Sequence, residues 1–536
     1  MDRHPFTGRT TCACRLNSNT PRAIAFLMIA CCMHGSLVRG DTHQKENRTD
    51  SMSVVSYEDF GAKGDGKTDD LPSIVRAHAH ANQHGLSVRA SDQATYYIGG
   101  LDLTAKVQTD TDFGDAKFII DDRDLDNIRA WMFEVRSALS PIQVEGVTSL
   151  KREQEKLELD LPHACVLIVT DSNVKRYIRF GGNQNRGSSQ TDVFLVDQNG
   201  NVDPNTPIIW DFDQITEIKA LPVDEDTLTI TGGHFTTIAN AAESKYNYHA
   251  RGINILRSNV VVDGLEHHVT GEGDHGAPYS GFIAVTDCAN VTVRDTVLTG
   301  RKTYRTIGAA GRTVSMGSYD ISLRRALNVS FVNCRQTNDI NDRKYWGIMG
   351  SNFCKNLRYE NCEFSRFDAH QGVVNATIRD STIGHMGIQL IGSGTFLLEN
   401  TTVHGGRFIT LRPDYGSTWR GGFIIRNCTF VPTGSGALSL IGGSHSGQHD
   451  FGYTCHLPEK ITIDTLHIAD DDRGGNYDGP YIFANFNRQL TDSSYDEKFP
   501  YVRSGEVSLK NVTTASGKPL RLSPNPYMFK DVVVSE

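Results

Sequence analysis

Side chains that can move protons or bind anions are concentrated between residues 302 and 420 of the sequence. Histidine, lysine and tyrosine can take or give a proton, and arginine can neutralise a carboxylate. This combination suits β-elimination on a uronic-acid polymer, in which the C6 carboxylate is neutralised, the C5 proton is removed and the leaving oxygen is protonated. We expect His370 to be the base, Arg412 the carboxylate clamp, and His385 or Tyr415 the acid.

Other roles for these residues remain open from the sequence. Lys344 is an alternative base, which would have to be buried, and Asp368 is expected to orient His370 or to hold a calcium ion. Glycoside hydrolysis needs two carboxyl groups at a defined separation instead, and Asp342 and Asp368 could supply them. The residues expected to bind substrate are Tyr304, Gln389, Arg407, Asp414 and Trp419.

A short repeat explains why such distant residues should meet. The pattern is an alternating apolar–polar segment that ends in Asp or Asn, which is typical of a half-buried strand. No helical pattern of 10–15 residues separates the repeats, so an alternating strand–helix fold is disfavoured. The polar repeat residues are Asp263, Asp295, Asn333, Asn361, Asp380, Asn400, Asn427, Asp464 and Asn511.

Strands that recur with loops of variable length predict a solenoid whose coils stack with like residues above like. We therefore predict an all-β chain, a right-handed single-stranded parallel β-helix, with the Asp and Asn residues forming a polar ladder at a bend. Residues at equal distances after the ladder should then stack. His370 and Gln389, each nine residues after a ladder position, are predicted to be neighbours.

The segment DFGAKGDGKTDD, residues 59–70, concentrates glycine and aspartate near the start of the folded part. A helical segment follows it, with Asp69 or Asp70 as the N-cap. This segment resembles the N-terminal signature of the pectate-lyase superfamily of right-handed parallel β-helix proteins. The resemblance implies a strand, a Gly/Asp turn and a helix that caps the first coil, but it names no reaction, because the superfamily includes lyases, hydrolases, epimerases and phage tailspikes.

The repeat is interrupted, which predicts an insertion. Residues 141–235 contain ordinary strands joined by polar turns, and we interpret them as an inserted β-rich subdomain or as elaborated coils. The predicted organisation is a cap and first coils over 54–140, the insertion over 141–235, and the main β-helix with its catalytic groove over 236–530.

The N-terminus resembles an export signal. Four arginines precede the apolar run of residues 23–33, which is too short to cross a bilayer and suits a signal peptide over residues 1–40. A lipoprotein signal with a lipidated Cys31 is the alternative. Residues 41–53 are expected to be a linker, and the protein to be secreted or periplasmic, without a transmembrane segment.

Cysteine spacing and charge exclude several classes of function. The 11 cysteines contain no CxxC pair, so a structural zinc site is disfavoured. The net charge is −9 with no basic run, so we expect no nucleic-acid partner. Two acidic or histidine-rich loops, residues 265–281 and 470–479, could hold a metal or calcium ion, although a solvated groove rim and a surface loop are the favoured interpretations.

The sequence therefore favours a monomeric, secreted enzyme that cleaves a uronic-acid-containing polysaccharide, sulfated or not, by elimination. A glycoside hydrolase of the same fold is the first alternative. A non-catalytic glycan-binding or adhesin solenoid is the second, and a tailspike the third. The mixture of acidic, basic and titratable residues argues against a purely binding groove, in which more aromatic residues would be expected.

Overall fold

The computed structural model describes residues 54–474 and 476–535. The predicted signal peptide, the linker and Cys31 lie outside these residues. Within the described part of the chain, no helix is both long and apolar enough to cross a membrane.

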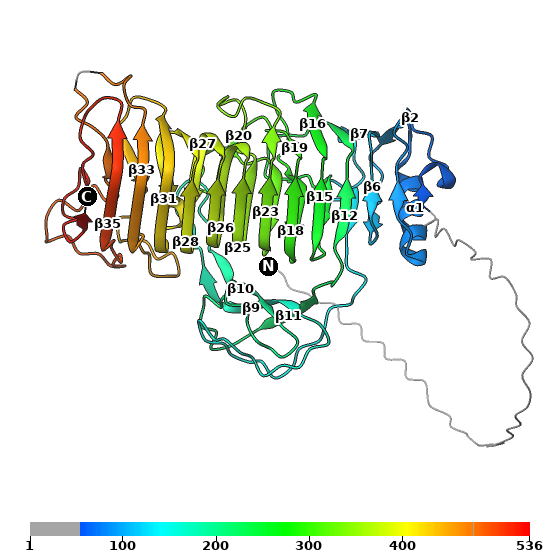
Figure 1. Ribbon diagram of the computed structural model, residues 1–536, viewed down its shortest axis with the longest axis horizontal. Helices are drawn as coiled ribbons and strands as arrows, with labels where there is room; N and C mark the ends of the chain where they lie inside the picture. Colours follow the sequence, from blue (N-terminus) through cyan, green and yellow to red (C-terminus); the bar gives the residue numbers. More distant parts are fainter. Residues whose placement is uncertain (1–53, 475, 536) are drawn as a thin grey trace, which may run out of the picture. The chain divides into compact units, whose positions relative to one another are not determined.

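The described chain winds into stacked coils, and each strand pairs in parallel with the equivalent strand of the next coil (Figure 1). The strands form three sheets, which we call sheets I, II and III in the order in which one coil passes through them. The predicted parallel β-helix is confirmed. It follows from the alternation in each segment, because alternate side chains of a strand point to opposite faces and one face fills the coil interior.

The strand bounds define the three sheets. Sheet I contains β1 (Val55–Ser56), β3 (Val88–Arg89), β6 (Thr111–Asp112), β12 (Leu228–Thr231), β15 (Val260–Asp263), β18 (Ala289–Arg294), β23 (Leu327–Val332), β28 (Gly392–Glu399) and β36 (Val533–Ser535). Sheet II contains β2 (Asp65–Asp69), β4 (Thr95–Ile98), β7 (Lys117–Asp121), β13 (His234–Ile238), β16 (Glu266–Thr270), β19 (Val297–Leu298), β24 (Arg335–Gln336) and β29 (Thr402–Gly405). Sheet III contains β5 (Ala105–Val107), β8 (Phe133–Val135), β14 (Ile253–Ile255), β17 (Ser280–Thr286), β22 (Tyr319–Arg324), β30 (Arg407–Leu411), β32 (Ser439–Gly442) and β34 (Tyr481–Phe483).

Six longer strands turn corners and contribute to more than one sheet. They are β25 (Met349–Glu360), β26 (Glu363–Arg379), β27 (Thr382–Leu390), β31 (Trp419–Pro432), β33 (Lys460–Ile468) and β35 (Glu506–Thr514). Inside the coils lies one continuous apolar core. The cysteines of the described residues are buried and form no disulfide, and Cys334, Cys362 and Cys428 belong to this core, as expected of small stacked interior residues.

Left-handed backbone conformations mark the corner between sheets I and II. Asn333, Asn361 and Asn427 have φ values of 55°, 51° and 49°. Asn361 donates a hydrogen bond to Asn333 at 2.9 Å, and Asn427 donates one to Asn400 at 2.9 Å. Asparagine tolerates this conformation better than other side chains that carry a Cβ. The predicted ladder therefore exists, and it fixes both the bend and the stacking of the coils.

Two predicted ladder positions are one residue away from the observed ones. The left-handed residues in those coils are Gly264 (φ 70°) and Thr465 (φ 66°). Asp263 instead lies in the last position of a strand, where it pairs with Arg294 of the next coil at 2.7 Å. Asp464 is in the equivalent place and pairs with Lys510 at 3.0 Å. The sequence pattern does not distinguish an Asp at the corner from an Asp one residue before it.

A second asparagine row, which the sequence analysis missed, lies at the start of sheet I. Its members are again left-handed, and each donates to the one before it, for example Asn328 to Asn290 at 2.9 Å and Asn356 to Asn328 at 2.8 Å. The row comprises Asn259, Asn290, Asn328, Asn356 and Asn375. Both ends of sheet I are thus fixed by Asn ladders.

The DFGAKGDGKTDD segment forms the predicted turn before a helix, α1 (Leu71–His84). The Asp70 carboxylate accepts the backbone amides of Lys63 at 2.6 Å and Gly64 at 3.0 Å, so it closes the turn and does not cap the helix. Asp69 instead accepts the amide of Leu71 at 3.1 Å. Helix α1 buries its apolar face in the core at the N-terminal end of the solenoid (Figure 1), so the predicted cap is confirmed.

The inserted β-rich subdomain is a three-stranded antiparallel sheet of β9 (Cys165–Arg176), β10 (Ser188–Val196) and β11 (Glu217–Pro222) with its own apolar core. It is inserted between β8 and β12 and lies below the middle coils in Figure 1. Residues from Leu228 onward belong to sheet I, so the insertion ends earlier than residue 235. A hairpin of β20 (Tyr304–Ile307) and β21 (Thr313–Met316) projects between sheets II and III.

Candidate functional site

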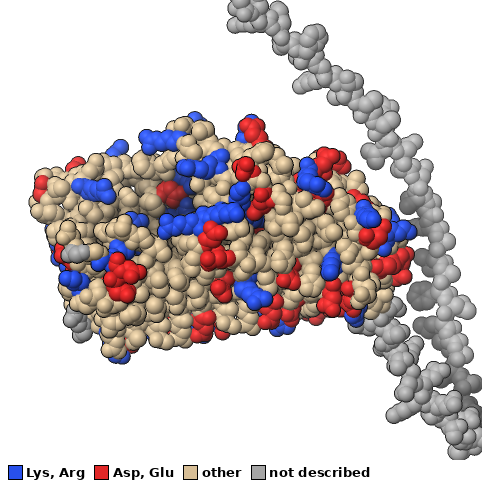
Figure 2. All heavy atoms as spheres, turned by 90° about the horizontal axis from the view of Figure 1, so that it is seen from above, with Lys and Arg blue, Asp and Glu red and all other residues tan. Residues whose placement is uncertain are grey.

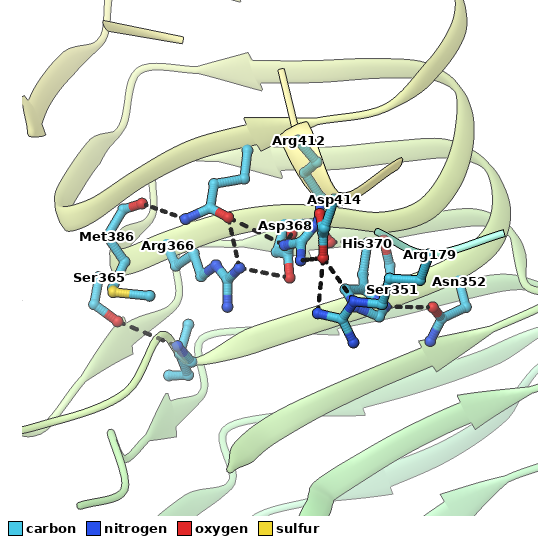
Figure 3. Close-up of polar contacts among 12 residues, drawn as sticks. Arg179, Ser351, Asn352, Ser365, Arg366, Asp368, His370, Met386, Arg412 and Asp414 are labelled. Atoms are coloured by element: carbon cyan, nitrogen blue, oxygen red, sulfur yellow. Dashed lines mark hydrogen bonds and ion pairs between the residues drawn. The ribbon is translucent and has the colours of Figure 1, made fainter. Parts of the chain in front are cut away.

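Strand β26 carries the centre of the candidate site. Phe367 and Ala369 belong to the coil interior, and the alternation of the strand places Arg366, Asp368 and His370 on the outer face of sheet III. Figure 3 shows these three side chains with their partners from neighbouring coils and from the insertion. A simple period-2 segment therefore presents a base, an acid and a cation on one face.

The observed stacking differs from the predicted one by two residues. Asp368 lies beside Gln389, which lies beside Thr410. His370 is therefore not the direct neighbour of Gln389. The register shifts between Phe364 and Arg366, because the next coil has two additional residues in the segment 384–386. Counting from the ladder is reliable only until such a bulge occurs.

Two arginines neutralise Asp368, which is completely buried. Arg412 lies 2.9 Å from one carboxylate oxygen and Arg366 lies 2.8 Å from the other. The side-chain oxygen of Gln389 accepts hydrogen bonds from the same two arginines, at 2.8 Å from Arg366 and 3.1 Å from Arg412. Asp368 thus positions the two guanidinium groups, whereas the hydrogen-bond partner of His370 in the described chain is Asn352.

The insertion supplies a third arginine to the site. Arg179, just after β9, lies 2.7 Å from Asp414, and Arg412 lies 3.0 Å from the same carboxylate (Figure 3). Burial alone would raise the pKa of Asp414, but Arg412 and Arg179 together hold it below its usual value. Three arginines and two aspartates therefore form one connected network with a surplus positive charge.

His370 lies at the edge of this network and is uncharged at neutral pH. Burial, followed by the fields of Arg412, Arg179 and Arg366, holds the pKa of His370 well below its ordinary value. Its Nδ1 lies 2.9 Å from the side-chain oxygen of Asn352 on β25. A carbonyl oxygen only accepts, so Nδ1 carries the proton and Nε2 keeps a free lone pair. This is the tautomer that a general base requires.

Tyr415 supports His370 from one side. The two rings meet edge to face with centroids 5.3 Å apart. Burial raises the pKa of Tyr415 to about 12, and the residue is only 1% exposed. It therefore keeps its proton at neutral pH, and its role as the acid stays a prediction.

A hollow of about 330 Å³ lies beside the network. It contains the predicted residues His385 and Arg407, and its lining also includes Arg473 and Thr410. Met386 connects this hollow with the arginine–aspartate network, because it lines the hollow and its backbone oxygen accepts a hydrogen bond from Gln389 at 3.2 Å. Figure 2 views the solenoid from the side on which β27 and the β20–β21 hairpin lie, and shows Lys and Arg side chains gathered around a hollow in this face.

Several predicted residues lie elsewhere. Trp419 is completely buried among the core aromatics Phe396 and Phe423, so its ring cannot stack on a sugar. Lys344 and Asp342 are exposed on the turn before β25, so Lys344 lacks the burial that its role as a base requires. Tyr304 lies on the β20–β21 hairpin, where its hydroxyl donates to the backbone of Gly273 at 3.4 Å.

The sequence analysis missed three members of the site. Arg366 could have been found, because it alternates with Asp368 and His370 in one predicted strand. Asn352 could not be assigned, because Asn is common in this sequence at structural positions. Arg179 carries no local signal, since it lies in the insertion and reaches the site only through the tertiary fold.

The two candidate metal loops are occupied by internal contacts. His267 is fully buried, with its Nδ1 2.7 Å from Asp320 and its Nε2 2.9 Å from Thr237. Asp470 accepts hydrogen bonds from Tyr477 and Ser516, both at 2.8 Å. Over residues 54–474 and 476–535, no group of three or more His, Cys, Asp and Glu side chains is arranged to hold a metal ion.

Comparison with known proteins gives one short sequence match. The chain is 32% identical over 98 residues to a capsule KL64-specific depolymerase of Klebsiella phage P510. The match spans 16% of this chain and 10% of the depolymerase. No protein-family model matches the chain.

Solved structures match over most of the chain. The tailspike gp61 of Pseudomonas phage phi297 aligns with a TM-score of 0.53 and 14% identity, covering 90% of this chain and 83% of gp61. The tailspike gp49 of Pseudomonas phage LKA1 aligns with a TM-score of 0.45 and 14% identity, covering 90% of this chain and 84% of gp49. The likeness to gp61 is a likeness of fold, and it agrees with the parallel β-helix described above.

Proposed function

We propose that this chain, which has the parallel β-helix fold of the pectate-lyase superfamily, is an enzyme that degrades an acidic polysaccharide by β-elimination on the outer face of sheet III. The observation that carries the proposal is an uncharged His370 with a free Nε2, surrounded by the guanidinium groups of Arg179, Arg366 and Arg412. The short match to a capsule depolymerase supports a polysaccharide as the substrate.

The proposed reaction begins with the sugar carboxylate. Arg179 faces it, because its side chain is 21% exposed, whereas Arg412 and Arg366 are buried and already held by Asp368. Neutralising that carboxylate acidifies the C5 proton, which favours its removal.

His370 then completes the elimination. Its Nε2 takes the C5 proton, the C–H electron pair forms the C4–C5 double bond, and the C4–O bond breaks with its electrons leaving on oxygen. The same surroundings that lower the pKa of His370 make its imidazolium a strong acid. We propose that this imidazolium returns the proton to the leaving oxygen, so that one residue serves as base and acid.

The hydrolytic alternative receives less support. Both oxygens of Asp368 are held by arginine, and Asp342 is exposed on a turn. A hydrolase needs one carboxyl group that can be protonated and a second that can act as base or nucleophile. A carboxylate locked between two guanidinium groups serves neither role well.

The test is digestion of a panel of acidic polysaccharides while the ultraviolet absorbance of unsaturated uronate is followed. We expect the absorbance to rise with at least one polymer. The rate of this rise should be about 10² to 10⁴ times lower in His370→Ala, the range for loss of a general base. Arg426→Ala, an exposed ion-pair residue on sheet I, is the matched control. New reducing ends without absorbance would overturn elimination in favour of hydrolysis.

A further inference from the structure

A second cavity lies between the inserted subdomain and the solenoid. Its volume is about 310 Å³, within the range of small-ligand pockets. Tyr177 lines it, and the Tyr177 ring packs against Tyr415, which in turn packs against His370. Two aromatic rings therefore separate this cavity from the proposed catalytic site, and nothing in the proposed reaction uses it.

Positive charge dominates the lining. Asp192 is the single carboxylate among the lining residues of the described chain, and Lys355 neutralises it at 2.8 Å. The lining also contains three arginines, Arg152, Arg176 and Arg420. Arg176 and Arg420 form no ion pair with any described residue, although Arg176 donates hydrogen bonds to the side chain of Gln190 at 2.8 Å and to the backbone of Gly452. The cavity therefore has an excess of guanidinium groups, and these match a carboxylate geometrically.

Aromatic surface adjoins these arginines. Trp210 from the insertion and Tyr453 from the solenoid both line the cavity, with ring centroids 6.2 Å apart. The Arg176 guanidinium lies 4.7 Å above the Trp210 ring, which orients both groups. An apolar face beside fixed cations suits a ligand that has a hydrophobic face and an anionic edge, as a uronic-acid ring has.

One buried polar atom of the lining has no partner among the described residues. The Nδ1 of His456 is buried and has no hydrogen-bond partner among the described residues. Arg152, Arg420 and His456 all line the cavity. Burial, and then Arg420 and Arg152 against the opposing Glu459, lowers the pKa of His456. Buried polar atoms are normally satisfied, and an exception calls for an explanation.

We propose that this cavity binds one carboxylate-bearing sugar unit of an acidic glycan, with Arg176 and Arg420 on the carboxylate, Trp210 and Tyr453 against the ring, and His456 bonded to a hydroxyl. The insertion, which contributes Arg152, Arg176 and Trp210, thereby forms half of a glycan-holding site distinct from the site of cleavage. The choice of an acidic glycan rests on the proposed function, whereas the site itself does not use His370.

The test is isothermal titration calorimetry of the whole chain with glucuronate, and in parallel with glucose and with acetate. We expect saturable binding of glucuronate and much weaker binding of the two fragments. Arg420→Ala should weaken glucuronate binding by about tenfold, the loss expected for one charge-assisted hydrogen bond. Trp210→Leu should weaken it similarly, while exposed Arg426→Ala should leave it unchanged.

His370→Ala separates this inference from the proposed function, since it should abolish cleavage and leave glucuronate binding intact. Absence of saturable glucuronate binding by the wild-type chain would overturn the inference. Equal affinity for acetate and glucuronate would also overturn it, because the cavity would then be an anion site without sugar recognition. Unaltered glucuronate binding in both Arg420→Ala and Trp210→Leu would place the binding elsewhere.

Discussion

Nδ1 of His370 lies 2.9 Å from the side-chain oxygen of Asn352, and the two residues belong to neighbouring coils. The contact fixes both the orientation and the tautomer of the imidazole. Asn352 is therefore a positioning residue, and its effect should be visible in the pH dependence of the reaction.

Asn352→Asp should raise the pKa of His370, because a carboxylate stabilises the imidazolium. The acid limb of the kcat profile should then move to higher pH. Asn352→Leu should lower kcat by about 10- to 100-fold, the usual effect of losing an outer-shell partner, with little change in KM. Steady-state rates from pH 4 to 9 test both variants. An acid limb that stays in place in Asn352→Asp would contradict this role.

Asp368→Asn should lower the free energy of unfolding by about 3 kcal/mol, because it leaves two buried arginines with one fewer counter-charge. Asp342→Asn, on an exposed turn, should change it by less than about 0.5 kcal/mol and should retain cleavage. Urea titration measures the first quantity, and product formation measures the second. Loss of cleavage in well-folded Asp342→Asn would instead support a hydrolase.

Arg179→Ala should raise KM about tenfold, with a smaller effect on kcat, because the insertion supplies this guanidinium to the substrate carboxylate. The local fold should survive, since Arg412 still neutralises Asp414. Arg186→Ala changes an exposed residue of the same loop and is the control. If both variants behaved like the wild type, Arg179 would be structural.

Asn361→Ala and Asn361→Gly separate the two contributions of the ladder. Both remove the hydrogen bond to Asn333, but only alanine is strained at a φ of 51°. We expect a loss of about 2 kcal/mol of unfolding free energy for alanine and about 1 kcal/mol for glycine. Equal losses would mean that the backbone conformation contributes nothing to the cost.

Stability should fall as the pH drops below 6.5, because burial lowers the pKa of His78 to about 3 and that of His445 to about 4. In the unfolded chain these histidines bind a proton near pH 6.5, whereas in the folded chain they stay neutral. The free energy of unfolding therefore falls by at most about 1.4 kcal/mol per pH unit for each histidine. Thermal unfolding from pH 7 to 4.5 measures the slope. His78→Phe should reduce it, and exposed His84→Gln should not.

Most of the fold was predictable because a solenoid repeats its signal. Each ladder residue, such as Asn361 or Asn400, marks one corner, and alternation before it marks one strand. The predicted turn before the capping helix is also confirmed, because it depends on contacts between residues close in sequence, such as the hydrogen bond from the Gly64 amide to the Asp70 carboxylate. Errors of one residue arose at Asp263 and Asp464, where the polar residue precedes the corner.

The site was predictable only where it lies on one strand or at an undisturbed offset. His370 and Asp368 were found in this way. Their relation to Gln389 was not, because the two additional residues at 384–386 shift the register. Trp419 was assigned to the site from its loop, although it begins a strand whose interior face it occupies. Arg179 required knowledge of how the insertion folds back.

The network around Asp368 has a mechanical consequence. A stack of coils that is pulled from its two ends should unravel one coil at a time, since each coil pairs mainly with its neighbours. The ion pairs of Arg412 with Asp368 and Asp414, and of Arg179 with Asp414, tie together β26, the segment after β30 and the insertion. Unfolding under force should therefore pause at these ion pairs, and the proposed substrate-binding face should stay folded until the flanking coils have unfolded.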